Sequence, residues 1–297
     1  MIYSCIRRTN RWYETAYCKI IVATSLFIFL PTLLLAQIQL IPTTNVLDRA
    51  GVGTVMVINT VDEPREISIQ TEFRYNVANE LGLSVDAGDY SELEMYDISN
   101  NLLIYPPRFI LGGGERRDVR VQHRMRGAMP DGGYFSRFMV RAEPMARDAI
   151  QEENADAIAV QLNYVYVQDI PLYHFYGTAT TGISINSFEV VEPDQNPEQY
   201  LFLFDMEKSG NSPYRGSVEI VIRDTDGEIV EERTRQVGLF TSRKVGIPMD
   251  RSSLQSGVEY DVQFTFRTRR SNSAPNELVQ APNVTWNSRF SISEATL

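Results

Sequence analysis

The chain has 297 residues, of which 43% are hydrophobic and 22% are charged, and its formal net charge is -10. This composition is that of an ordinary globular protein and excludes a disordered, collagen-like or coiled-coil chain. An acidic chain lacks the basic surface that neutralises phosphates, so nucleic acid is excluded as a partner, and the length suits two medium-sized domains.

The first 36 residues differ from all that follow. Basic residues precede an apolar run from Ile20 to Ala36, which is the order of a secretory signal peptide. We predict cleavage before Gln37. The alternative is an uncleaved anchor over Ile20–Ile41, because about 20 apolar residues span a bilayer. Both cysteines, Cys5 and Cys18, precede the apolar run, so the exported part contains no disulfide.

From Ile38 onward, apolar and polar residues alternate with the period of a half-buried strand. In Glu66–Tyr75 the row that faces inward is Ile67, Ile69, Thr71, Phe73 and Tyr75. The other predicted strands are Val52–Asn59, Leu102–Ile110, Arg117–His123, Gly133–Ala142 and Ala157–Ile170. Gly-rich breaks separate them, which indicates a β-sandwich. Ala87–Tyr96 and Met145–Ala155 are rich in helix formers, and we predict that they are loop excursions.

The small, polar segment Gly177–Gly182 is the predicted domain boundary. Beyond it the predicted strands are Ile183–Val191, Tyr200–Met206, Ser217–Arg223, Glu228–Arg235, Lys244–Pro248, Gly257–Arg267 and Trp286–Ile292. Asp226-Gly227 is typical of a type I′ hairpin turn. The predicted divisions are a signal peptide at 1–36, a first β-sandwich domain at 37–176 and a second at 177–297, which makes the chain all-β.

No residue pattern of a catalytic, cofactor-binding or metal site is present. His123 and His174 are the only histidines, and neither has another His or Cys near it in the sequence. Since metal motifs need such neighbours, we interpret both histidines as structural or surface residues. We therefore expect a protein that is not an enzyme and that uses no cofactor. A glycan-processing enzyme on a β-sandwich is the least favoured alternative, because it would need a convergent acidic site.

Three segments together resemble the periplasmic pilus-assembly chaperones of the chaperone-usher pathway. Tyr105–Val121 has the family's prolines, Gly-containing turn and following strand. Asp131–Ala142 has its aromatic, Arg and apolar strand, and Ala157–Phe175 has its long last strand, which ends in an apolar-aromatic cluster. The resemblance covers residues 37–176 well and residues 183–295 in outline.

The resemblance implies two immunoglobulin-like β-sandwich domains in tandem and an activity without chemistry. In that family the last strand of the first domain is lent to an incomplete pilin subunit, so that alternate side chains fill its apolar groove. The corresponding residues here are Ile158, Val160, Leu162, Tyr164 and Tyr166. The same row could instead be buried in the domain's own core. The implied function is that of a periplasmic chaperone in fimbrium biogenesis, pilus assembly and cell wall organization, with fimbrial or pilin-like subunits and an outer-membrane usher as partners.

The sequence also departs from the family. The family binds the subunit's terminal carboxylate with a basic pair, and the matching positions fall near Thr43 or Thr44 and near Pro171, none of which is basic. Arg108 and Arg120 are basic residues within the matching motif and are candidates for the cleft. If the apolar N-terminal segment is retained, the alternative function is a membrane-anchored structural or adhesive immunoglobulin-like protein of the cell envelope.

Overall fold

The computed structural model describes residues 37–124, 127, 129–145, 164–193, 196 and 198–292. The strands of the first half are β1 (Ile38–Ile41), β2 (Asn45–Leu47), β3 (Val52–Asn59), β4 (Arg65–Glu72), β5 (Asn76–Ala78), β6 (Ser84–Asp86), β7 (Leu102–Tyr105), β8 (Arg108–Leu111), β9 (Arg116–His123), β10 (Gly132–Pro144) and β11 (Tyr166–Tyr176). Those of the second half are β12 (Gly182–Val191), β13 (Gln199–Ser209), β14 (Tyr214–Arg223), β15 (Ile229–Leu239), β16 (Arg243–Asp250), β17 (Glu259–Arg267) and β18 (Val284–Ser291).

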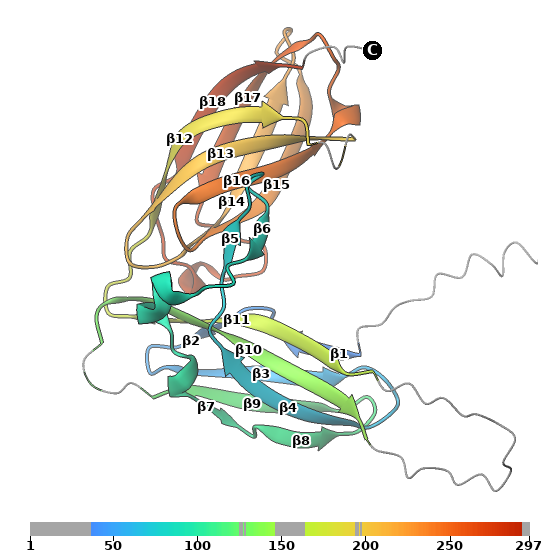
Figure 1. The fold of residues 1–297 in the computed structure, drawn as a ribbon, viewed down its shortest axis with the longest axis vertical. Coiled ribbons are helices and arrows are strands. Elements are labelled where there is room, and N and C mark those ends of the chain that lie inside the picture. Colours follow the sequence, from blue (N-terminus) through green and yellow to red (C-terminus); the bar gives the residue numbers. More distant parts are fainter. Residues whose placement is uncertain are drawn as a thin grey trace, which may run out of the picture. The chain divides into compact units, whose positions relative to one another are not determined.

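Each half is a sandwich of two sheets (Figure 1). In the first sandwich the strand orders are β1-β3-β9-β7 and β2-β11-β10-β4-β8, and in the second they are β12-β13-β16 and β15-β14-β17-β18. The predicted fold, all-β with two immunoglobulin-like β-sandwich domains in tandem, is confirmed. Strand β11 ends at Tyr176 and β12 begins at Gly182, and the division of the chain near residue 177 stays a prediction.

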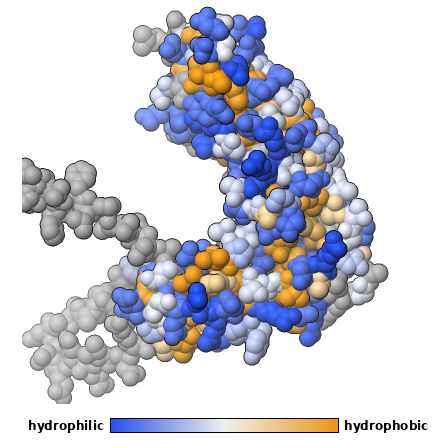
Figure 2. Space-filling model, turned by 180° about the vertical axis from the view of Figure 1, so that it is seen from behind, coloured by the Kyte–Doolittle hydropathy of each residue, from blue (hydrophilic) through white to orange (hydrophobic). Residues whose placement is uncertain are grey.

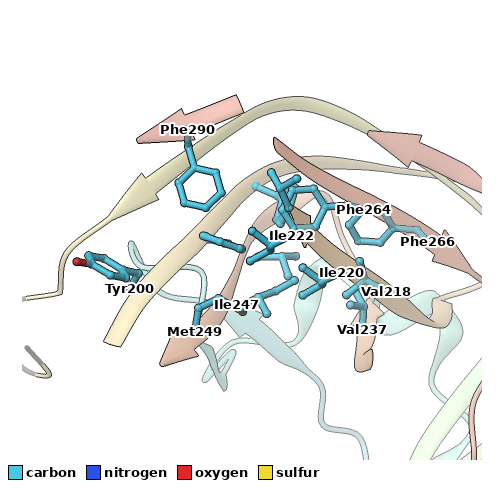
Figure 3. Close-up of a cluster of buried hydrophobic side chains, with 14 of the residues drawn as sticks. Tyr200, Val218, Ile220, Ile222, Val237, Ile247, Met249, Phe264, Phe266 and Phe290 are labelled. Atoms are coloured by element: carbon cyan, nitrogen blue, oxygen red, sulfur yellow. The ribbon is translucent and has the colours of Figure 1, made fainter. Parts of the chain in front are cut away.

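The alternation of apolar residues accounts for both cores. In β4, Ile67 is 0% and Ile69 is 6% exposed, as the predicted inward row requires. In β17 the side chains of Tyr260, Val262 and Phe264 point into the second core, where Figure 3 shows aromatic and branched side chains packed from facing strands. Burial of such side chains stabilises each sandwich by roughly 1.5 to 3 kcal/mol per residue.

The predicted strand Leu102–Ile110 is wrong as a single element. The chain forms β7 up to Tyr105 and then β8, which belongs to the opposite sheet of the first sandwich. Pro106 and Pro107 stand between them, and proline has no N–H to donate to a sheet. The two prolines therefore end one strand and let the chain change sheets.

One local expectation is also corrected. At the hairpin between β14 and β15, Gly227 has φ +83° while no residue other than glycine has a positive φ among the described residues. Since a type I′ turn needs positive φ at both central residues, Asp226 excludes it. The Gly227 N–H donates to the Asp224 carbonyl oxygen, which is a type I turn closed by glycine. Ala87–Tyr96 lies in a loop excursion, as expected, with one short 3-10 helix at Ser91–Tyr96. The other expected excursion, Met145–Ala155, lies outside the described residues except for Met145.

Residues 73–98 form an excursion between β4 and β7. It carries the β5-β6 hairpin, whose tip lies against strand β16 of the second sandwich. There the Gly246 N–H donates to the Gly82 carbonyl oxygen at 2.9 Å. At the base of the excursion, Tyr75 packs in an aromatic cluster with Phe135 and Phe240. The excursion thus covers part of an edge strand of the second sandwich.

Strand β1 bears on the predicted alternative of a membrane anchor over Ile20–Ile41. Ile38 and Leu40 are 4% and 2% exposed in the first core, and β1 pairs with β3. A membrane anchor that extends to Ile41 is therefore wrong, because these residues are a strand of the sandwich. Among the described residues, no helix is long and apolar enough to cross a bilayer. The predicted signal peptide, residues 1–36, lies outside the described residues.

Candidate functional site

The first half of β11 has an uncovered edge. Along its whole length β11 pairs with β10, from Ala142 opposite Tyr166 to Gly132 opposite Tyr176. On its other side β2 pairs only with Leu172–His174. Within the described residues, no strand pairs with Tyr166–Ile170 on that side. With respect to the described strands, the backbone groups on this edge are available to another strand.

Apolar side chains are exposed at the same edge. Tyr164 is 62%, Val165 is 42% and Val167 is 58% exposed. Single exposed apolar residues are common on proteins, and Figure 2 shows separate hydrophobic patches within a mainly hydrophilic surface. At β11, the exposed side chains of Tyr164, Val165 and Val167 lie at an edge that no described strand covers at Tyr166–Ile170.

The structure describes only two residues of the predicted donor row, Tyr164 and Tyr166. Ile158, Val160 and Leu162 lie outside the described residues. Tyr164 is exposed, whereas Tyr166 packs against the first core and its hydroxyl accepts a hydrogen bond from Gln37 Nε2 at 2.6 Å. The donor role of this row therefore stays a prediction.

The two candidate basic residues lie apart from this edge. Arg108 is on β8, the opposite edge strand of the same sheet, where its Nε lies 3.6 Å from Glu66 Oε1. Arg120 is an exposed residue of β9, opposite Thr54 and Tyr105 in the other sheet. The structure does not bring the two arginines together, since they belong to different sheets.

His123 and His174 are brought together, which the sequence did not predict. His123 is on β9 and His174 is on β11, so the pair joins the two sheets of the first sandwich, and the Nδ1 atoms are 2.8 Å apart. The residues are 2% and 0% exposed. The interpretation of each histidine as a structural residue fits this burial. Their separation in the sequence hid the contact, and only the topology creates it.

Burial disfavours the charged form of both imidazoles. Desolvation, and secondarily the neighbouring His174, lowers the pKa of His123 to about 4. Desolvation also lowers the pKa of His174, and the nearby carboxylate of Asp48 acts in the opposite direction. Among the described residues, no group of three or more His, Cys, Asp or Glu side chains is arranged to hold a metal ion.

The exposed apolar residues at this edge that sequence reasoning missed are Val165 and Val167. The predicted row took every second residue back from Tyr166, so the intervening residues were not considered. The signal was present in the unbroken apolar and aromatic run Tyr164–Val167. Such a run is typical of a strand with apolar side chains on both faces.

Comparison with known proteins gave structural neighbours only. No protein-family model and no curated protein matches the chain. Among solved structures, the chain is similar to the E. coli chaperone DraB, with 14% identity, a TM-score of 0.41, and coverage of 84% of this chain and 95% of that chain.

Two further similar structures are chaperone complexes. One is the CsuC-CsuE chaperone-tip adhesion subunit pre-assembly complex of Acinetobacter baumannii, with 11% identity, a TM-score of 0.41, and coverage of 84% of this chain and 98% of that chain. The other is the Salmonella enterica SafA pilin in complex with the SafB chaperone, with 13% identity, a TM-score of 0.37, and coverage of 84% and 95%. Pilus chaperones are thus among the solved structures that this chain resembles.

Proposed function

We propose that this protein is a periplasmic chaperone that binds fimbrial or pilus subunits and caps them with an edge strand during surface-fibre assembly. The observation that carries the proposal is the uncovered edge of β11 at Tyr166–Ile170, with Val165 and Val167 exposed beside it. The sequence resemblance of residues 37–176 to pilus-assembly chaperones supports the class of partner.

The mechanism is β-strand addition. A subunit that lacks one strand has an apolar groove and an unpaired edge, and a strand from the chaperone satisfies both. Backbone hydrogen bonds supply affinity, and side chains at alternate positions fill pockets and supply specificity. β10 pairs with all eleven residues of β11 and holds the strand extended, so little conformational entropy is lost on binding.

The same contact prevents premature assembly. An unpaired strand edge is a template for pairing with any other chain, and subunits with such edges polymerise. While β11 occupies the groove, another subunit has no access to it. The activity is therefore reversible binding, and an outer-membrane usher is a candidate for the protein that receives the subunit.

Charge substitution in the donor strand tests the proposal. In Val167→Asp the new carboxylate would be desolvated in the subunit's groove, so we expect subunit binding to fall by 100-fold or more, as about 3 kcal/mol of lost affinity requires. Leu162→Asp and Tyr164→Asp should do the same if the predicted row is the inserted one. Binding is measured by capture of subunits from the native envelope, followed by titration of the captured subunit.

The matched control is Ile110→Asp on β8. Ile110 is 54% exposed, close to the 58% of Val167, and β8 is the other edge of the same sheet. This variant should bind subunits as the unsubstituted protein does. Equal binding by Val167→Asp, Leu162→Asp and Tyr164→Asp, with all three folded by circular dichroism, would contradict the donor-strand mechanism.

A further inference from the structure

The sheet β15-β14-β17-β18 of the second sandwich has one face in the core and one face turned away from it. In β14 the side chains of Val218, Ile220 and Ile222 are 0% exposed and belong to the second core. Successive side chains of a strand point to opposite faces of its sheet, so Ser217 and Glu219 lie on the outer face. The outer face therefore carries polar side chains where the inner face carries branched apolar ones.

A hollow of about 610 Å³ lies on this outer face. Its floor is formed by two adjacent strands, because Ser217 of β14 pairs with Arg267 of β17 and Glu219 pairs with Thr265. The volume lies in the range of ligand-binding clefts, but such clefts are usually lined by apolar and aromatic side chains. Every residue that lines this hollow is polar or charged. The hollow therefore suits a ligand that is polar on all sides, and it offers no surface for an apolar or a flat aromatic group.

Several hydrogen-bonding groups in the hollow are unused within the part of the chain that the structure describes. The hydroxyl groups of Ser217, Thr234 and Thr265 make no hydrogen bond to another described residue. Arg235 and Arg269 are exposed, and neither forms an ion pair with a described carboxylate. Three hydroxyl groups and two guanidinium groups are thus available to a ligand.

The hollow is cationic although the chain as a whole has a net charge of -10. Arg235, Arg267 and Arg269 line it, and Glu219 is the one acidic residue among the lining residues. Glu219 is already engaged, because its Oε2 accepts a hydrogen bond from Arg267 Nη1 at 2.6 Å. The positive charges of Arg235 and Arg269 are left over, and a local excess of positive charge favours an anionic ligand.

The polar surface continues along the same strands. A second hollow of about 350 Å³ is lined mainly by polar residues, among them Arg223 of β14, Gln263 of β17 and Asn287 of β18. The six-residue step from Ser217 to Arg223 corresponds to roughly 20 Å along a strand. A ligand that occupies both hollows is therefore an elongated chain.

We propose that this outer face binds a polysaccharide chain that carries carboxylate groups. Sugar hydroxyls both donate and accept hydrogen bonds, as the hydroxyl groups of Ser217, Thr234 and Thr265 do. The carboxylates form charge-assisted hydrogen bonds with Arg235 and Arg269. A sugar ring has hydroxyls around its whole rim, whereas an extended peptide directs its backbone groups to two edges, so a saccharide matches a floor of hydroxyl groups better than an acidic peptide does. The site belongs to the second sandwich alone and does not rest on subunit capture by β11.

Isothermal titration calorimetry of the purified protein with three probes tests the proposal. Hexagalacturonate is the acidic saccharide, maltohexaose is the neutral saccharide of the same length, and hexaglutamate is the acidic peptide. We expect hexagalacturonate to bind saturably and the other two probes to bind at least about 10-fold more weakly. The proposal is overturned if hexagalacturonate gives no saturable binding, or if either of the other probes binds as tightly.

Variants on the outer face locate the site. The double substitution Arg235→Gln and Arg269→Gln should weaken hexagalacturonate binding by about 10-fold, because it removes both unpaired charges. Arg116→Gln is the matched control, since Arg116 is an exposed arginine of β9 in the first sandwich. This control should bind hexagalacturonate as the unsubstituted protein does. Unchanged binding by the double variant, or an equal loss in the control, contradicts the site.

The hydroxyl groups are tested separately from the charges. Thr265→Val removes one hydroxyl group at nearly constant shape and should weaken hexagalacturonate binding by about 3-fold or more. Thr234→Val tests the same point at an exposed position, where a change in side chain affects folding less. Unchanged affinity in both valine variants, with each folded by circular dichroism, overturns the saccharide assignment.

Discussion

Two sheet edges in this molecule are treated in opposite ways. The edge of β16 in the second sandwich meets the β5-β6 hairpin, where Gly246 donates to Gly82. The edge of β11 in the first sandwich is left without a partner strand at Tyr166–Ile170 among the described residues. Proteins usually protect their edges, because an exposed edge recruits other chains. The proposed function uses the uncovered edge.

The covered edge depends on close backbone approach. A Cβ added to Gly246 would lie 2.2 Å from the Leu81 carbonyl oxygen, and one added to Gly82 would lie 2.3 Å from the Gly246 nitrogen. Gly82 also has φ +68°, which disfavours any other residue. The hairpin therefore reaches β16 only with glycine on both sides. No comparable pair of glycines lies along the uncovered half of β11, where Val167, Gln168 and Asp169 are exposed.

The largest expected loss of stability comes from truncating Tyr75, at the base of the excursion formed by residues 73–98. Tyr75 is 1% exposed and packs among Phe73, Tyr90, Phe135 and Phe240. Tyr75→Ala should lower the free energy of unfolding by about 3 to 5 kcal/mol, because it leaves a cavity in an aromatic cluster. Urea denaturation measures this loss. Tyr105→Ala, at a side chain that is 77% exposed, should change stability by less than about 0.5 kcal/mol.

Lowering the pH tests the buried contact between His123 and His174, which joins the two sheets of the first sandwich. The pKa of His123 is about 4 in the folded protein and about 6.5 in the unfolded chain, so the unfolded state binds the proton first. The stability is fully present above pH 6.5 and is lost as the pH falls towards 4. We expect the free energy of unfolding to be about 2 kcal/mol lower at pH 5 than at pH 7. Replacing His123 and His174 together by leucine should remove most of this difference, and an unchanged pH dependence would contradict the assignment.

A smaller effect is expected from the glycine contact itself. Gly246→Ala should push the hairpin tip away from β16 and cost about 1 to 3 kcal/mol, as other overpacked sites do. Hydrogen exchange should become faster at the amides of residues 82–84 and 246 and stay unchanged in β10. Gly238→Ala is the control, because its added Cβ would meet nothing closer than 3.4 Å. If both variants exchange alike, the contact does not hold the hairpin.

The smallest effect on stability should come from the uncovered edge. Val167→Lys replaces an exposed side chain, so the free energy of unfolding should stay within about 0.5 kcal/mol of its original value. A lysine on an edge strand blocks pairing with other strands. Sedimentation at high concentration should therefore show less self-association than for the unsubstituted protein. A stability loss of several kcal/mol would mean that Val167 is part of the core.

Strand content could be predicted because alternation is local. The rows that include Ile67 and Phe264 are visible in any ten-residue window, and both are buried as expected. The division of Leu102–Ile110 between two sheets could also have been predicted from the sequence, because Pro106 and Pro107 have no N–H to donate to a neighbouring strand. These features depend on neighbouring residues alone.

The candidate site could be predicted only in part, because it depends on contacts between distant residues. The uncovered edge exists because β2 pairs with β11 at Leu172–His174 and no further. The pairing of His123 with His174 follows from the stacking of two sheets.

The apolar residues in and just before β11 form two groups, one buried and one exposed. Ile170 and Leu172 are 3% and 0% exposed, and the first sandwich depends on them for its packing. Val165 and Val167 are exposed and are not members of that core cluster, so in the proposed function their identity is set by the bound subunit. Under selection for a new partner, these two positions can diversify at once without a compensating change in the interior. Under the proposed function, subunit recognition is therefore free to evolve faster than the sandwich that presents the strand.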